Sequence, residues 1–114
     1  MKRSGRLFAA LLLSSLGAGC VREARLDEQI DRIGQLLIDA ESNGAMRCAP
    51  RQLAVARSQL EFGELERARG FSSRAERHLE LADQNARAAK LLSPPEHCRD
   101  RSGPPSPSKS GESP

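Results

Sequence analysis

Apolar residues recur every three or four positions along three stretches of this 114-residue chain, and that spacing is typical of α-helices with one buried face. The first stretch runs from Val21 to Asn43, the second follows Pro50, and the third follows Ser73. The apolar positions are Leu26, Ile30, Ile33, Leu37 and Ala40, then Leu53, Ala56, Leu60 and Gly63, and finally Ala75, Leu79, Ala82, Ala86 and Ala89. The pattern predicts an all-α fold with three helices.

Residues typical of helix ends bound the second and third stretches. Pro50 suits the first position of a helix, where a missing N–H costs nothing, and Gly70 suits the left-handed residue after a helix end. Ser73 and Glu76 have the spacing of a capping box, which predicts that they cap the third helix. Pro94 ends that helix. The two helices therefore form an antiparallel hairpin that turns at Gly70.

The hairpin brings Cys48 and Cys98 together. Each helix has about 20 residues and spans roughly 30 Å, so the chain returns to its starting level near Cys98. A module this small, with seams rich in alanine, buries little apolar surface, and a disulfide would add about 4 kcal/mol in the chain-entropy model. A zinc site with His97 is an alternative for the two cysteines, although a tetrahedral site needs four ligands.

The first helix carries the most apolar stripe, which must be covered. It could pack on the hairpin and complete a three-helix bundle, or pair with another chain as a coiled coil. The short connection from Ala45 to Ala49 favours packing within the molecule. Asp39 and Glu41 lie unfavourably near the negative end of this helix, so we expect it to be the least stable of the three.

The N-terminal residues 1–19 have the pattern of an export signal. Lys2, Arg3 and Arg6 precede an apolar core at residues 7–16 that is too short for a permanent membrane span. The small residues at 17–19 before Cys20 resemble a lipobox, which implies that Cys20 carries lipid and becomes the first mature residue. Ordinary signal cleavage nearby is the alternative.

The number of cysteines favours lipidation. Three cysteines are present, and a Cys48–Cys98 pair leaves Cys20 alone in an oxidising compartment. Val21 follows Cys20 in place of the aspartate that retains lipoproteins at the inner membrane in enteric bacteria. We therefore expect a lipid anchor in the outer membrane, with the protein on the periplasmic face.

Charge and aromatic content argue against nucleic acid as a partner. Three of the 18 basic residues precede Cys20 while all 15 acidic residues follow it, so the mature chain is formally neutral. The chain has no Trp or Tyr on which bases could stack.

Two family resemblances cover the hairpin. Phe62, Gly63, Gly70, Ala75, Leu79 and Ala82 resemble the skeleton of one tetratricopeptide repeat. The run Cys48-Ala49-Pro50, then Leu60-Glu61-Phe62, His78-Leu79-Glu80-Leu81-Ala82, Asn85-Ala86 and Ser93-Pro94 to Cys98 resembles an uncharacterised family, domain of unknown function 4398. The second resemblance implies an envelope lipoprotein with a helical hairpin, and it implies no known activity.

The residues that could perform catalysis are few. His78 and His97 are the only histidines, and we expect His78 to pack at the edge of the third helix. Carboxylates alternate with arginines, as Asp83 and Arg87 do at i, i+4, which is typical of a solvated helix face. No phosphate-binding glycine loop or hydrolase motif occurs. We therefore expect no catalytic activity, no metal and no cofactor.

Four apolar residues fall outside the strict seams and form the candidate interaction surface. These residues are Phe62, Leu65, Phe71 and Leu81. They either widen the core or face a partner, which suggests an interaction module for an unidentified envelope protein. The alternative function is a structural envelope component that forms homo-oligomers through the first helix.

The C-terminal part of the chain is rich in proline. Six of the seven prolines lie between Pro94 and Pro114, together with serine, glycine and charge, which predicts disorder. The expected organisation is a signal peptide at 1–19, an anchor and first helix at 20–47, the hairpin domain at 48–98 and a disordered tail at 99–114.

Overall fold

The structure is a computed structural model that describes residues 17–99, with side chains described from residue 19. It contains five helices in this range. These are α2 (Gly17–Ser42), α3 (Ala45–Cys48), α4 (Pro50–Ala68), α5 (Ser72–Leu91) and α6 (Pro95–Cys98). The predictions on residues 1–16 and 100–114 lie outside the described residues.

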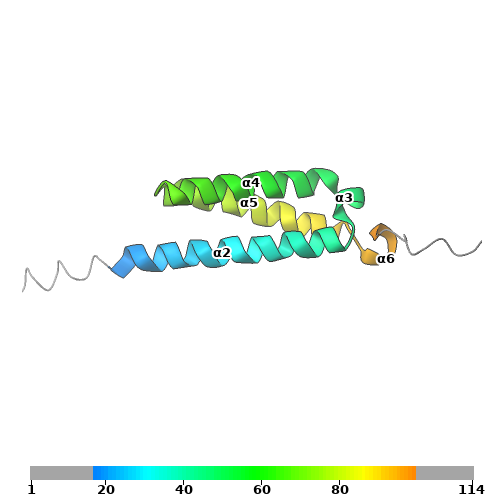
Figure 1. The fold of residues 1–114 in the computed structure, drawn as a ribbon, viewed down its shortest axis with the longest axis horizontal. Helices are drawn as coiled ribbons and strands as arrows, with labels where there is room; N and C mark the ends of the chain where they lie inside the picture. The colour runs from blue at the N-terminus through cyan, green and yellow to red at the C-terminus, as the bar shows by residue number, and fades with distance from the viewer. Residues whose placement is uncertain (1–16, 100–114) are drawn as a thin grey trace, which may run out of the picture.

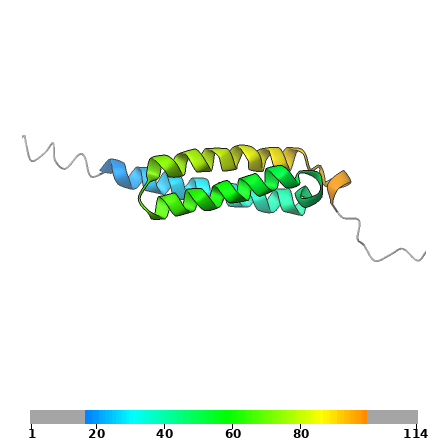
Figure 2. The same ribbon diagram turned by 90° about the horizontal axis from the view of Figure 1, so that it is seen from above.

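The three long helices lie side by side as a bundle (Figure 1). Helices α4 and α5 form the antiparallel hairpin, and α2 packs against both of them. The predicted all-α fold with three main helices is confirmed. The described chain enters at one end of the bundle, and α6 lies at the other end, as both views show (Figures 1 and 2).

The core lies where the three predicted apolar stripes meet. Its buried side chains include Leu26, Ile33, Leu37, Leu53 and Leu79, together with alanines of all three long helices. Ile30 and Leu60 are partly buried against this cluster. Since the stripe of α2 is covered by the hairpin, the first helix packs within the molecule, as the short connection predicted.

Helices α4 and α5 approach closely at Gly63. Gly63 is buried, and a Cβ atom at this position would lie 2.6 Å from Leu79 Cδ2 and 2.8 Å from Leu79 Cγ. Leu79 is itself fully buried. The glycine therefore provides the space that the largest side chain of the α5 seam occupies.

The glycines after α2 and α4 adopt the left-handed conformation. Gly70 has φ +82° in the α4–α5 turn, as the sequence predicted. Gly44 has φ +97° between α2 and α3, and a Cβ there would overlap the carbonyl oxygen of Cys98. Helix α4 begins at Pro50, also as predicted.

The predicted capping box is wrong. Helix α5 begins two residues earlier than a cap at Ser73 requires, at Ser72, with Phe71 at the N-cap and no side-chain capping bond. Ser73 Oγ and both carboxylate oxygens of Glu76 instead accept hydrogen bonds from Arg22 of α2. The guanidinium of Arg22 therefore binds the two side chains that were predicted to cap α5, although α2 is distant from them in sequence.

Two further boundaries differ from the prediction. Helix α2 begins at Gly17 and includes Cys20, so the helix starts four residues earlier than expected. Residues 95–98 are helical as α6, although the proline content predicted disorder from Pro94 onward. Pro95 occupies the first turn of α6, where it is compatible with a helix, and the disulfide at Cys98 holds the segment on the bundle.

Candidate interaction surface and anchor site

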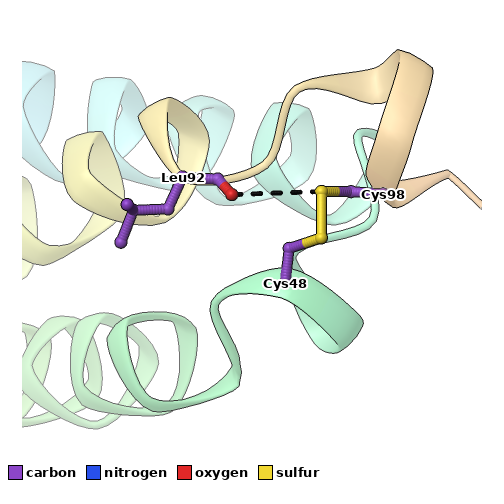
Figure 3. Close-up of a disulfide and its surroundings, with 3 residues drawn as sticks. All are labelled: Cys48, Leu92 and Cys98. Atoms are coloured by element: carbon purple, nitrogen blue, oxygen red, sulfur yellow. Dashed lines mark hydrogen bonds between the residues drawn. A yellow bond between two sulfur atoms is a disulfide. The ribbon is translucent and has the colours of Figure 1, made fainter.

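The disulfide closes the end of the bundle opposite the α4–α5 turn. Cys48 and Cys98 are joined with an S–S distance of 2.05 Å and a Cα–Cα distance of 5.8 Å (Figure 3). Cys98 Sγ also lies 3.9 Å from the carbonyl oxygen of Leu92. The predicted pairing is confirmed, and it links the short helices α3 and α6.

The zinc alternative at these cysteines is excluded because both sulfur atoms are in the disulfide. His97 lies on α6 and is exposed. Within residues 17–99 no group of three or more His, Cys, Asp or Glu side chains is placed to hold a metal ion.

Cys20 lies in the first turns of α2 and is an exposed, free thiol. Its end of α2 is attached to α5 through Arg22, whose Nε lies 2.9 Å from Glu76 Oε1. One residue further, Glu23 Oε1 accepts a hydrogen bond of 2.9 Å from Ser72 Oγ. Cys20 is therefore held near the α4–α5 turn, at the end of the bundle opposite the disulfide.

A band of half-exposed apolar side chains crosses from α4 to α5. The rings of Phe62 and His78 lie 5.6 Å apart, and Gln59 Oε1 accepts a hydrogen bond of 2.7 Å from His78 Nδ1. Leu65 neighbours Phe62 at i+3, and Leu81 neighbours His78 at i+3. Phe62, Leu65 and Leu81 are each between 44% and 48% exposed.

This band faces away from α2. On α5, Glu76 and Asp83 pair with arginines of α2. His78 lies two residues after Glu76, and Leu81 two residues before Asp83, so each is about 200° around the helix from the α2 contact. We call the surface formed by Val55, Phe62, Leu65, His78 and Leu81 the α4/α5 outer face.

The structure thus brings together three of the four predicted surface residues. Phe71 is also 48% exposed, but it lies at the α4–α5 turn with the Arg74 guanidinium 4.8 Å from its ring centroid. Val55 was missed by sequence reasoning. It is 37% exposed and lies seven residues before Phe62, a spacing of two turns that could have identified it.

Ion pairs surround the contact between α2 and the hairpin. Lys90 Nζ lies 2.8 Å from Asp39 Oδ2, Arg57 pairs with Glu41, and Arg67 Nη2 lies 2.6 Å from Asp27 Oδ2. The two acids that lie unfavourably near the end of α2 are therefore partners of cations on the hairpin.

These contacts shift the pKa values of two carboxyl groups. Hydrogen bonds from Lys90 and then Gln35 lower the pKa of Asp39. The hydrogen bonds from Arg22, and then its charge, lower the pKa of Glu76. The same contact raises the pKa of Arg22. Each shift favours the charged form of the group that joins α2 to α5.

The surface at the α4–α5 turn contains a basic hollow of ≈ 410 Å³. It is lined by Arg22 of α2 and by Gly70, Phe71, Ser72, Ser73, Arg74 and Arg77 around the start of α5. Sequence reasoning did not identify it, because it depends on where α2 packs relative to the turn.

Comparison with known proteins gave no match to a family model, a curated protein or a solved structure. The resemblances to the tetratricopeptide repeat and to domain of unknown function 4398 therefore stay predictions. Among residues 17–99, no helix combines the length and the apolar character required to cross a bilayer.

Proposed function

We propose that the chain is a non-catalytic bacterial outer-membrane lipoprotein, anchored through Cys20, whose periplasmic helical bundle binds another envelope protein. The α4/α5 outer face carries the proposal. Phe62, Leu65 and Leu81 are half-exposed there, and the face lies opposite α2. Contiguous exposed apolar side chains are typical of protein-binding surfaces.

The partner surface is expected to be apolar at its centre. In the band, the Phe62 ring packs at a tilt of 41° against the ring of His78, whose Nδ1 is already bonded to Gln59. Few polar groups at this point therefore need new partners, and binding would bury mainly ring and aliphatic surface. Aromatic side chains in such positions often provide much of the binding energy.

The state of the cysteines supports the anchor. Cys48 and Cys98 are consumed by the disulfide, whereas Cys20 is exposed and free near the start of α2. The proposal predicts that the Cys20→Ala variant of the full chain moves from the membrane fraction to the soluble periplasmic fraction. Intact-mass measurement of the wild-type protein should find acyl chains on the mature N-terminal residue. An unmodified Cys20 would favour the alternative of a secreted protein without lipid.

The alternative function, oligomerisation through the first helix, has less support. The stripe of α2 that would pair with another chain, which includes Leu26, Ile33 and Leu37, is buried on the hairpin. A homo-oligomer would therefore have to use another surface.

Site-specific photocrosslinking tests the binding face. A benzophenone amino acid replaces Phe62 or Leu81 in the full chain, and the control replaces Ile38 of α2, which is 60% exposed. The proposal predicts a crosslink to one envelope protein from positions 62 and 81 and none from position 38. The Phe62→Glu and Leu81→Glu variants should then lose co-purification of that same protein, and Ile38→Glu should keep it.

Two results would contradict this proposal. A crosslink only to a second copy of the chain would favour the structural alternative. The same partner captured equally from position 38 would show that the α4/α5 outer face is not the binding surface.

A further inference from the structure

The hollow at the α4–α5 turn gathers three guanidinium groups from two helices. Arg22 comes from α2, and Arg74 and Arg77 come from the first turns of α5. No acidic residue lines the hollow. Phe71, at its rim, is half-exposed and has the Arg74 guanidinium 4.8 Å from its ring centroid. An aromatic side chain and several arginines are thus exposed together.

The positive charge at this end is only partly neutralised. Arg22 is paired with Glu76. Glu66 lies 3.8 Å from both Arg69 and Arg74, so one carboxylate faces two guanidiniums. Among residues 19–99, no carboxylate lies within ion-pair distance of Arg77. The surface therefore retains excess positive charge.

This surface lies beside the anchoring residue. The Glu23–Ser72 hydrogen bond fixes the level of the α5 start along α2, and Cys20 is three residues earlier, or about 5 Å of helical rise. The start of α2 extends beyond the α4–α5 turn in both views (Figures 1 and 2). By the same rise per residue, Arg22 lies about 3 Å and Arg74 about 8 Å from the level of Cys20. Both lie within about one Debye length, roughly 8 Å at physiological salt, of a surface that holds Cys20, and Arg77 lies farther away, at about 12 Å.

We propose that Phe71, Arg74, Arg77 and Arg22, here called the basal surface, contacts anionic phospholipid headgroups of the membrane that holds the Cys20 lipid. This inference rests on the lipid anchor of the proposed function. The arginines attract the headgroup phosphates, and Phe71 enters the interface between headgroups and acyl chains. Each arginine near an anionic surface changes the ratio of docked to undocked protein by about five-fold. The bundle then stands on the membrane with its turn downward, and the disulfide end is farthest from the lipid.

The test can supply the anchor chemically, so it does not depend on lipidation in the cell. Among residues 19–99, all buried side chains lie between Leu26 and Cys98, so a chain that begins at Cys20 retains the bundle. The free thiol of Cys20 is coupled to a maleimide-headgroup lipid in vesicles. The chain has no Trp, so Phe71→Trp introduces a single fluorophore at the basal surface. Phe62→Trp is the matched control, because both phenylalanines are 48% exposed.

The readout is quenching of the tryptophan by brominated lipids. We expect Trp fluorescence at position 71 to be quenched on vesicles with phosphatidylglycerol, and much less on phosphatidylcholine alone or at 0.5 M salt, a salt level chosen because it screens exposed charges. Fluorescence at position 62 should not change. The Arg74→Gln, Arg77→Gln double substitution is then combined with Phe71→Trp. It should lower the docked-to-undocked ratio by at least about five-fold, the effect of one arginine near the surface, because Arg74 lies within one Debye length and Arg77 lies farther away. The Arg47→Gln, Arg51→Gln control removes equal charge near the disulfide and should have no effect.

Circular dichroism of each variant establishes that the bundle is retained. Absence of quenching at position 71 on anionic vesicles would overturn the inference while leaving the cellular anchor untouched. Equal quenching on neutral and anionic vesicles would also overturn it, because the contact would then need no headgroup charge. An unmodified Cys20 in the cell would instead overturn the lipoprotein proposal.

Discussion

The contact between helix α2 and the α4–α5 hairpin differs in its physical basis from the contact between the two helices of the hairpin. The two hairpin helices meet through alanines and through the close contact of Gly63 with Leu79, and the disulfide between α3 and α6 closes their open end. Helix α2 contributes large aliphatic side chains, including Leu26, Ile33 and Leu37, surrounded by exposed ion pairs. The hairpin therefore depends on shape and a covalent bond, and α2 depends on apolar burial.

This difference predicts how each part responds to substitution. A close helix contact with buried glycine and alanine leaves no room for an added methyl group, because protein interiors are close-packed. Exposed ion pairs contribute little each, typically below about 1 kcal/mol. The hairpin should thus be sensitive to small changes in volume, and the rim of α2 should tolerate changes in charge.

Removal of the disulfide should have the largest effect. The Cys48→Ser, Cys98→Ser double variant should lower the free energy of unfolding by about 2–5 kcal/mol, because the unfolded chain gains the freedom of an unclosed loop. Urea denaturation followed by circular dichroism measures this loss. Cys20→Ser is the control and should unfold at the wild-type urea concentration, since Cys20 is exposed and unpaired. Equal stability of the double variant and the control would show that noncovalent packing alone closes the hairpin.

Two glycine substitutions compare the helices directly. In α4, Gly63→Ala should destabilise the protein by about 1–3 kcal/mol, because the new methyl group overlaps Leu79 Cδ2. In α2, Gly34→Ala should stabilise it by up to about 1 kcal/mol, because nothing lies within 4 Å of the added Cβ and alanine favours the helix. Thermal unfolding should therefore shift in opposite directions. A gain from both substitutions would mean that the α4–α5 contact opens easily.

Acid should have the smallest of these effects on the free energy of unfolding. It should act on the ion pairs that join α2 to the hairpin. The pKa values of Asp39 and Glu76 are lowered in the folded protein. Their contribution to stability is thus complete above the ordinary carboxyl pKa of about 4 and is lost as the pH falls through the lowered folded values. The urea concentration at which half of the protein is unfolded is measured from neutral pH to pH 2. It should decline less for the Asp39→Asn, Glu76→Gln double variant than for the wild-type protein. An identical decline would assign the acid sensitivity to other groups.

The fold was largely predictable because its main determinant is local. Stripes at three and four residue spacing give the buried faces of all three helices, and equal helix lengths place Cys98 beside Cys48. The prediction of the capping box was wrong because the contact that decides it is not local. Ser73 and Glu76 are bound by Arg22, which is 51 and 54 residues away in the chain, and local spacing contains no information on that contact.

The candidate surfaces were predictable only in part. Phe62 and Leu81 could be recognised as apolar residues outside the seams, but their common face is defined by the side of the hairpin that α2 covers. The same holds for the basic hollow, which joins Arg22 to residues near Gly70. Both surfaces require the packing of α2, which depends on contacts across the whole domain.

The described chain enters the bundle at one end and leaves it at the other, so the length of the bundle separates these two points. From Cys20 to Ser42, α2 rises by about 33 Å at 1.5 Å per residue. If Cys20 is embedded in lipid and the turn rests on the headgroups, any sequence that continues after Cys98 starts at that stand-off height. The bundle then acts as a rigid spacer, and lengthening α2 and the hairpin by whole turns would raise the starting point of that sequence in steps of about 5.4 Å.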